Sequence, residues 1–213
     1  KYGDVSLSME KFESDCQLVL DEYLAGYIPE SKFLADARPW NNYKTDYRPL
    51  VQRAKMMGQV VVAANAPRRY VNLVARKGCD GLKELPKESR SYLPPMPIGT
   101  GSPEYQERIE DLMGEIHDGM GLSMFQAQCT WDATMAYRID QAYKANKKRK
   151  IFHLAGRFHT DYRLGTVDQL QLRRKKLRLA NISCFPAPDF TNPAWNMYAD
   201  LADYVILVAP EED

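Results

Sequence analysis

The sequence lacks several features that would place it in a large and familiar class of proteins. Its formal net charge is only +1, so its composition does not favour nucleic acid or an anionic membrane, which both select strongly basic surfaces. No apolar run approaches the roughly 20 residues that a membrane-spanning helix needs. The sequence opens on Lys1-Tyr2-Gly3-Asp4, already close to a predicted strand, so we expect no signal peptide within it. A cytosolic protein and an exported protein without its leader are therefore both expected alternatives.

Cysteine and histidine are too few and too scattered for the common redox and metal motifs. The four cysteines form no C-x-x-C pair, and the three histidines form no H-E-x-x-H motif or other ligand pair at metal spacing. There is no G-x-S-x-G elbow of a serine hydrolase, and the Gly99–Ser102 segment lacks the lysine of a phosphate-binding loop. We therefore expect mainly structural thiols and no zinc site of a common type.

What is present is an alternation of strand-like and helix-like segments. The 213 residues, 45% of them hydrophobic and 27% charged, suit one globular domain with a sizeable core. Strands are predicted at residues 5–9, 60–64, 151–155, 177–183 and 204–208, and helices at residues 13–25, 47–57, 67–74, 122–146 and 167–175. This order predicts an α/β fold in which a mostly parallel sheet is flanked by helices.

One segment interrupts the alternation. The stretch from Leu85 to Pro103 is rich in Pro, Gly and Ser, which is typical of irregular chain. We interpret residues 85–146 as a helical excursion or small lobe within a single domain that covers residues 1–213.

Three predicted strands end in polar residues. Glu10 follows the first strand, Asn65 ends the second, and His159 lies in the loop that begins at Gly156 after the third. Ligands of open parallel sheets bind outside the carboxyl ends of the strands. We therefore expect these three side chains to line one polar pocket, although a surface ion pair with Lys11 is an equally simple interpretation of Glu10.

The long helix contributes a second group of candidates. Gln128 and Asp132 lie one turn apart on its apolar stripe, and a buried amide or carboxylate needs a partner. They either brace neighbouring backbone or line the same pocket. Arg68 and Arg69, in the first turn of another helix, oppose the helix dipole, so at least one of them is expected to bind a carboxylate or an anion there. For Arg68, the expected partner is Asp132 or Glu10. His153, in mid-strand, is expected to be a core histidine.

Four ordered motifs resemble those of the ChaN-like haem-binding proteins, in a superfamily with the Tiki proteases and erythromycin esterases. The motifs are Ser8-Met9-Glu10-Lys11-Phe12-Glu13, Ala63-Ala64-Asn65-Ala66-Pro67-Arg68, Ala127 to Ala136, and Leu154-Ala155-Gly156-Arg157-Phe158-His159. The resemblance implies an α/β domain with a helical excursion. It also implies an exported, membrane-anchored lipoprotein or a periplasmic protein with a role in haem or iron uptake.

The resemblance has one departure. Family members usually begin with a further strand that ends in a Gly-Glu-x-His-Asp-like motif, whose histidine joins the pocket. This sequence starts after that position, and its Glu115-Ile116-His117-Asp118 segment is similar but lies elsewhere in the chain. Without that histidine, the resemblance supports a metal-dependent hydrolase less well.

Two hypotheses about function follow from the resemblance and the residues. In the first, the protein binds haem through Tyr162, with His159 in support and Arg68 or His159 near the propionates, because a phenolate is an accepted haem ligand. In the second, Glu10, His159 and Arg68 act around a divalent metal or a water molecule in a hydrolase. The expected partners are haem and a haem-uptake receptor, with a homodimer as one option. Contact with a membrane would be made only through an N-terminal lipid anchor outside this sequence.

Overall fold

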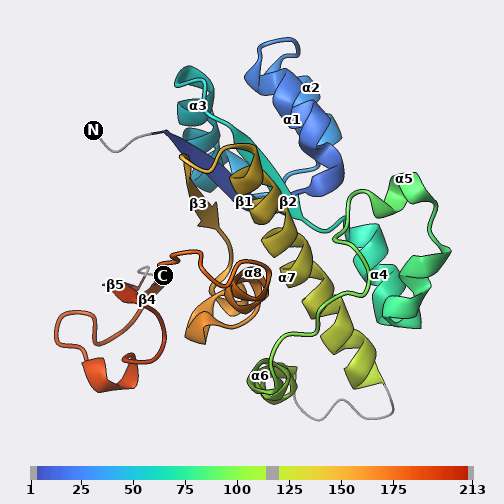
Figure 1. Cartoon of the computed structure of the whole chain (residues 1–213). Helices are drawn as coiled ribbons and strands as arrows, with labels where there is room; N and C mark the ends of the chain where they lie inside the picture. The colour runs from blue at the N-terminus through green and yellow to red at the C-terminus, as the bar shows by residue number, and fades with distance from the viewer. Residues whose placement is uncertain (1–3, 114–119, 211–213) are drawn as a thin grey trace.

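A three-stranded parallel sheet forms the centre of the fold in the computed structural model, which describes residues 4–113 and 120–210 (Figure 1). Strand β1 (Val5–Glu13) lies between β2 (Val61–Asn65) and β3 (Lys150–Leu154) and runs parallel to both. Met9 stands opposite Ala63 on one side and Leu154 on the other. The three carboxyl ends therefore lie at one edge, and the predicted parallel α/β architecture is confirmed.

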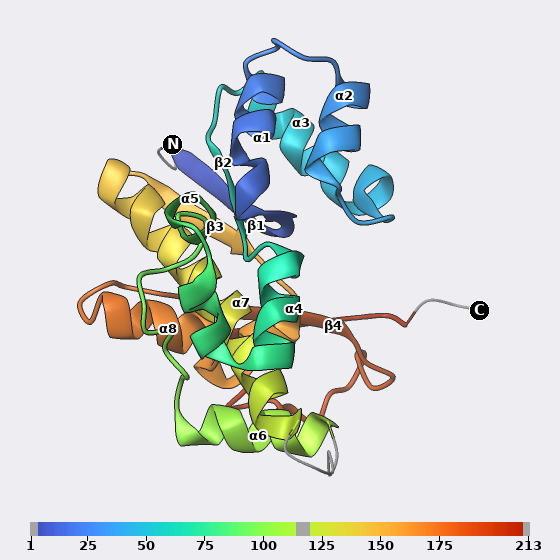
Figure 2. The same cartoon turned by 90° about the vertical axis from the view of Figure 1, so that its right-hand side faces the viewer.

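Helices cover both faces of this sheet (Figure 2). Three of them, α1 (Gln17–Leu24), α2 (Glu30–Ala37) and α3 (Arg48–Met56), pack with the aromatic core that includes Phe12. The other face is covered by α7 (Met120–Ala145), which packs on β2, with α4 (Arg68–Lys77) and α8 (Thr166–Arg173) packed against it. Of these helices, α2 is absent from the sequence prediction, and the helix predicted over residues 13–25 begins as a 3-10 turn at Ser14–Cys16.

The two faces of β1 differ in chemistry. Leu7 and Met9 point into the aromatic core with α1 to α3. The residues that alternate with them, Ser8 and Glu10, are also buried but contact His153 and the loop after β3. Because side chains alternate along a strand, one short segment supplies both a dry core and a polar layer.

A second, two-stranded parallel sheet is formed by β4 (Ile182–Pro186) and β5 (Tyr204–Val208). The strand predicted at residues 177–183 is therefore displaced, whereas the one at residues 204–208 is confirmed. Leu177 and Leu179 explain the displacement, because they pack against α7 and α8 as irregular chain rather than in a strand ladder. One face of the small sheet is exposed and apolar; it carries Ile182, Cys184, Pro186, Tyr204, Ile206 and Val208.

The segment that precedes α7 in the sequence packs against α7. Two helices lie in it, α5 (Lys87–Arg90) and α6 (Pro103–Met113). Tyr105 and Ile109 of α6 pack against Phe125 and Cys129 of α7. The residues around His117 lie outside the described part of the chain. Within the described part, no helix is both long enough and apolar enough to span a membrane.

Candidate functional site

The candidate site lies at the carboxyl edge of the three-stranded sheet, where Glu10 meets the loop that follows β3. One carboxylate oxygen of Glu10, Oε2, accepts a hydrogen bond of 2.6 Å from the Gly156 N–H. The other, Oε1, lies 3.8 Å from Nε2 of His159. His159 belongs to the short turn Arg157–His159 and is only 9% exposed. The structure thus brings together Glu10 and His159, two of the three strand-end residues singled out in the sequence.

Asp132 of α7 completes a buried polar network on the far side of His159. Its Oδ1 lies 2.9 Å from Nδ1 of His159 and accepts a hydrogen bond of 2.8 Å from the Thr166 hydroxyl. Its Oδ2 accepts a hydrogen bond from the hydroxyl of Tyr105 in α6. Asp132 is fully buried, so these three partners replace the water that a carboxylate would otherwise bind.

Burial and the neighbouring carboxylates shift the pKa values of His159 and Tyr105 in this network. Burial lowers the pKa of His159, but attraction to Asp132 and Glu10 outweighs burial, and the net pKa is raised above the usual value. Burial and the neighbouring Asp132 carboxylate together raise the pKa of Tyr105, which therefore keeps its proton and donates a hydrogen bond to Asp132. The two carboxylates that flank His159 thus favour its protonated form more than water would.

Gly165 allows the close approach of the chain to this network. Its φ is +57°, and a Cβ at this position would lie 2.8 Å from the backbone oxygen of His159 and 3.0 Å from Oδ1 of Asp132. A side chain would therefore both strain the backbone and displace the network. Gly165, Thr166 and Tyr105 belong to the site but were not singled out in the sequence, because no spacing connects them with His159.

A second histidine, His153, lies in β3, before the loop that carries His159. Nδ1 of His153 is 2.9 Å from the Ser8 hydroxyl across the β1–β3 pairing, and Nε2 is buried with no hydrogen-bond partner among the described residues. Burial, reinforced by repulsion from His159, lowers the pKa of His153 to about 4. The neutral form of His153 is therefore favoured, and its ring is held within the sheet by Ser8, although the residue as a whole is only partly buried.

Tyr162 lies three residues after His159 but in a different environment. Its φ and ψ are 60° and 18°, a left-handed conformation that residues with a side chain rarely adopt, and it is 45% exposed. Its N–H donates a 2.7 Å hydrogen bond to the carbonyl of Leu201, which holds the backbone in place. A strained residue that the surrounding contacts fix in an exposed position is a candidate for function.

Asp161 anchors this strained turn. Its carboxylate is buried, accepts a 2.7 Å hydrogen bond from the Ser183 hydroxyl and forms a 2.9 Å ion pair with Arg157. The adjacent Arg163 also has a positive φ of 60° and pairs with Asp203. The turn is therefore attached both to the β3 loop and to the small sheet of β4 and β5.

Three of the residues predicted for the pocket, Arg68, Asn65 and Gln128, form no side-chain hydrogen bond or ion pair with this network among the described residues. Arg68 is exposed, and Asp132 and Glu10 have other partners, so the predicted pairing of Arg68 with either one is wrong. The arginine that does bind a carboxylate is Arg69, which pairs with Asp15. The sequence could not separate the two neighbours, because both lie in the first turn of the same helix.

Asn65 and Gln128 also differ from the prediction. The side-chain oxygen of Asn65 accepts a 2.9 Å hydrogen bond from the Ala66 N–H and does not cap α4, whose N-cap residue is Pro67. Gln128 is only partly buried, and its side chain forms no hydrogen bond with any described residue. Its neighbour Gln126 accepts a hydrogen bond from the Cys79 N–H instead. Neither Asn65 nor Gln128 contacts His159 through a hydrogen bond.

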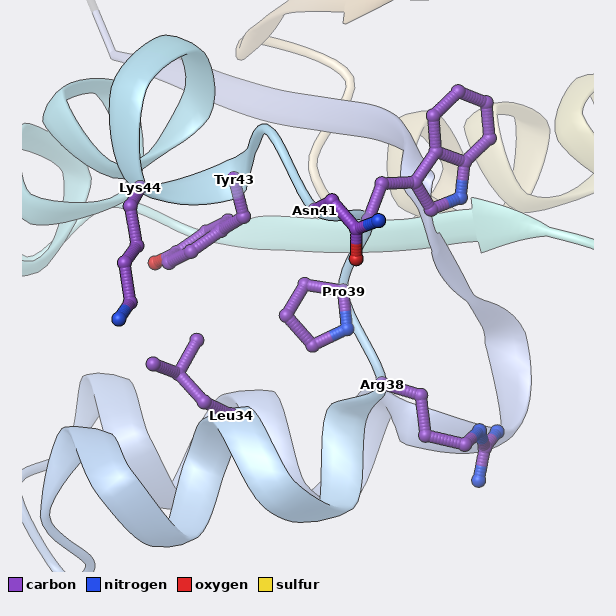
Figure 3. Close-up of a pocket in the computed structure, with 7 residues that line it drawn as sticks. Leu34, Arg38, Pro39, Asn41, Tyr43 and Lys44 are labelled. Atoms are coloured by element: carbon purple, nitrogen blue, oxygen red, sulfur yellow. The ribbon is translucent and has the colours of Figure 1, made fainter.

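A separate hollow of about 220 Å³ lies between α2 and the segment that follows it (Figure 3). Apolar and cationic side chains line it together; they are Leu34, Arg38, Pro39, Trp40, Asn41, Tyr43 and Lys44. Nζ of Lys11 lies 3.2 Å from the centre of a Trp40 ring, and Arg38 pairs with Glu13 and Asp15. Two cations of this region, Lys11 and Arg38, thus already have partners within the chain. Among the described residues, no three His, Cys, Asp or Glu side chains are grouped in a way that could hold a metal ion.

The fold and the site define a class, that of α/β proteins with a polar site at the carboxyl edge of a parallel sheet. Within this class, residues 1–170 match a family model described as "Haem-binding uptake, Tiki superfamily, ChaN". The match covers most of the 213 residues. The chain therefore belongs to this ChaN family of the Tiki superfamily.

One solved structure agrees with this assignment at the level of the fold. A structure described as "Cofacial heme binding to ChaN of Campylobacter jejuni" is 14% identical, with a TM-score of 0.61 over 85% of this chain and 68% of that chain. A mutant of the erythromycin esterase EreC in its open conformation is 12% identical, with a TM-score of 0.43 over 86% of this chain and 62% of the esterase chain. Comparison with curated proteins gives no match.

Proposed function

We propose that this protein binds haem non-covalently, with the phenol oxygen of Tyr162 as the iron ligand. The observation that carries the proposal is the presentation of Tyr162, which is half exposed on a strained turn that neighbouring residues hold in place. Family membership supplies the ligand class, because the family is described as haem-binding. A haem protein needs at least one axial ligand from a side chain, and a tyrosine phenolate is one of the recognised choices.

The chemistry around Tyr162 fits this role. Its hydroxyl forms no hydrogen bond with any residue that the structure describes, so the oxygen is available to a ligand from outside the chain. Arg108, Arg157 and Arg163 surround the turn, and guanidinium groups form strong paired hydrogen bonds with carboxylates such as the haem propionates. We assign this supporting charge to these arginines rather than to Arg68, which has no contact with the turn among the described hydrogen bonds and ion pairs.

His159 supports the site from within in this proposal. Its Nδ1 is engaged by Asp132, its Nε2 faces Glu10, and it is almost completely buried. A ligand from solvent therefore reaches Tyr162 more easily than the imidazole. The function of the Glu10–His159–Asp132 chain is then to fix the loop that carries Tyr162.

The alternative is a metal-dependent hydrolase that uses Glu10, His159 and Arg68. The observation in its favour is the Glu10–His159–Asp132 chain, because a carboxylate that orients a histidine is a common catalytic arrangement. Two observations weigh against it: Arg68 is separate from the chain, and His159 has little exposed surface. We therefore rank haem binding first.

The proposal extends to the cell. It includes a role in haem or iron uptake and export as a periplasmic or membrane-anchored lipoprotein. It also includes a receptor that exchanges haem with the protein, and a homodimer. The similar Campylobacter structure is described by its cofacial haem binding, and a homodimer of the present chain is one option within the proposal. Fractionation of cells that express the complete protein tests the compartment. Sedimentation with and without haemin tests the dimer.

Titration of the protein with haemin, followed through the Soret band, tests the central proposal. Tyr162→Phe keeps the ring and removes only the oxygen, so we expect a changed spectrum and an affinity at least about tenfold weaker, equivalent to about 1.4 kcal/mol. Tyr27→Phe is the matched control, because Tyr27 is 81% exposed and far from this site in the sequence, and it should behave like the unaltered protein. An unchanged Tyr162→Phe would exclude Tyr162 as the ligand. No binding by the unaltered protein would reject haem and favour the hydrolase.

A further inference from the structure

Arg108, in the helical segment before α7, contacts the ring of Tyr162. It comes from α6, and its guanidinium carbon lies 4.5 Å from the centre of the Tyr162 ring. This geometry is that of a cation–π contact, in which the ring face attracts the positive charge. The contact joins two segments that are distant in the sequence, and neither segment alone predicts it.

Arg108 is not required for the neutralisation of Asp161. Arg157 already pairs with this carboxylate at 2.9 Å and Ser183 donates to it at 2.7 Å, whereas Nη2 of Arg108 is 4.0 Å away. A separation of 4.0 Å is the outer limit of an ion pair and is too long for a hydrogen bond. The positive charge of Arg108 is therefore directed mainly at the tyrosine ring.

The burial of Arg108 also indicates that its charge is directed at the ring of Tyr162. Its side chain is only 25% exposed, and its Nε is buried with no hydrogen-bond partner among the described residues. An arginine that is largely withdrawn from water and incompletely bonded is held there at a cost in free energy. Apart from the 4.0 Å approach to Asp161, the contact with Tyr162 is the interaction among the described residues that this placement provides.

We infer that Arg108 is a positioning residue for Tyr162, which orients the phenol ring and places a positive charge over the face of the ring whose oxygen would bind iron. The inference rests on the proposed function for the identity of the bound group. A cation next to an anionic ligand offsets its charge, so removal of the cation favours ferric over ferrous iron and makes the reduction potential more negative. Arg108 thus links α6 to the properties of the site.

The stack itself is tested without haem. In the NMR spectrum of the haem-free protein, the side-chain protons of Arg108 should be shifted upfield by the ring current of Tyr162, and Tyr162→Leu should remove this shift. Arg108 protons at ordinary positions in the unaltered protein would overturn the inference, whatever the protein binds.

The effect on the bound group is tested with haemin and three variants. Arg108→Gln should weaken binding roughly two- to fivefold, the size expected of a partly exposed cation–π contact, and make the reduction potential more negative. Arg108→Lys keeps the charge and should lie between Arg108→Gln and the unaltered protein. Arg48→Gln is the control, because Arg48 pairs with Glu30 in another part of the fold.

The outcomes separate the two proposals. If the unaltered protein binds haem but Arg108→Gln matches it in spectrum, affinity and potential, the role of Arg108 is rejected while haem binding stands. If no haem binds although the Arg108 ring-current shift is present, the stack is correct and the proposed function fails.

Discussion

The two ends of the loop after β3 differ sharply, although only three positions separate His159 from Tyr162. His159 is buried, lies between two carboxylates and adopts an ordinary backbone conformation. Tyr162 is half exposed, has a left-handed backbone and leaves its hydroxyl without a partner among the described residues. The inner end therefore carries stability and the outer end carries the surface chemistry. The following predictions test this division, from the largest expected effect to the smallest.

Asp132→Ala should be the most damaging change at the inner end. It removes one of the two carboxylates that flank a buried His159 and leaves the Tyr105 and Thr166 hydroxyls without an acceptor. Loss of one partner from a buried ion pair costs about 3–5 kcal/mol, and urea denaturation followed by circular dichroism measures it. Asp80→Ala, at an exposed aspartate in an ion pair, should stay within about 0.5 kcal/mol. Similar values for the two variants would contradict the central place of Asp132.

Gly165→Ala separates backbone strain from crowding at the inner end. Gly26 has a comparable φ of +81°, and no atom lies within 4 Å of the place that a Cβ would take there, so Gly26→Ala should cost only the strain, about 1–2 kcal/mol. Gly165→Ala adds contacts with His159 and Asp132, and overpacking typically costs a further 1–3 kcal/mol or so. The same denaturation measurement gives both values. Equal losses of unfolding free energy in the two variants would show that the network accommodates the added methyl group without a measurable cost.

The contributions of His153 and His159 to the free energy of unfolding should change in opposite directions as the pH changes. The folded-state pKa of His153 is about 4, below the unfolded value of about 6.5, so its contribution to stability is lost as the pH falls from 6.5 towards 4. The pKa of His159 is raised, so its contribution is complete below about pH 6.5 and is lost as the pH rises through the folded value. Each group changes the free energy of unfolding by at most about 1.4 kcal/mol per pH unit.

NMR titration of the imidazole protons checks this pH prediction. His153→Gln and His159→Gln assign the two signals by their disappearance. We expect the His153 signal to titrate well below the His159 signal. If both histidines titrate together near pH 6.5, the electrostatic description of the inner end is wrong.

Tyr162→Phe should have the smallest effect on stability. The hydroxyl has no described hydrogen bond, and the ring that stacks on Arg108 is retained, so the free energy of unfolding should change by less than about 0.5 kcal/mol. Urea denaturation without haemin provides the measurement. A loss of more than about 1 kcal/mol would place the hydroxyl in an internal hydrogen bond and remove the distinction between the two ends.

Much of the fold follows from local pattern. The continuous apolar run at residues 60–64 predicts the buried strand that the structure shows as Val61–Asn65, and the helical periodicity at residues 122–146 predicts α7 (Met120–Ala145). Parallel strands end at one edge, so the proximity of Glu10 and His159 was also predictable. These features depend on periodicity and on connectivity, and both can be recognised in a single sequence.

Tertiary structure decided which polar residues meet. Asp132 has Tyr105, Thr166 and His159 as partners rather than Arg68, and the contact of Arg108 with Tyr162 joins segments with no common motif. The sequence determined that buried polar groups in α7 need partners, because burial without them is costly. It could not determine which partners they find, because that depends on how α6, α7 and the loop after β3 pack in three dimensions.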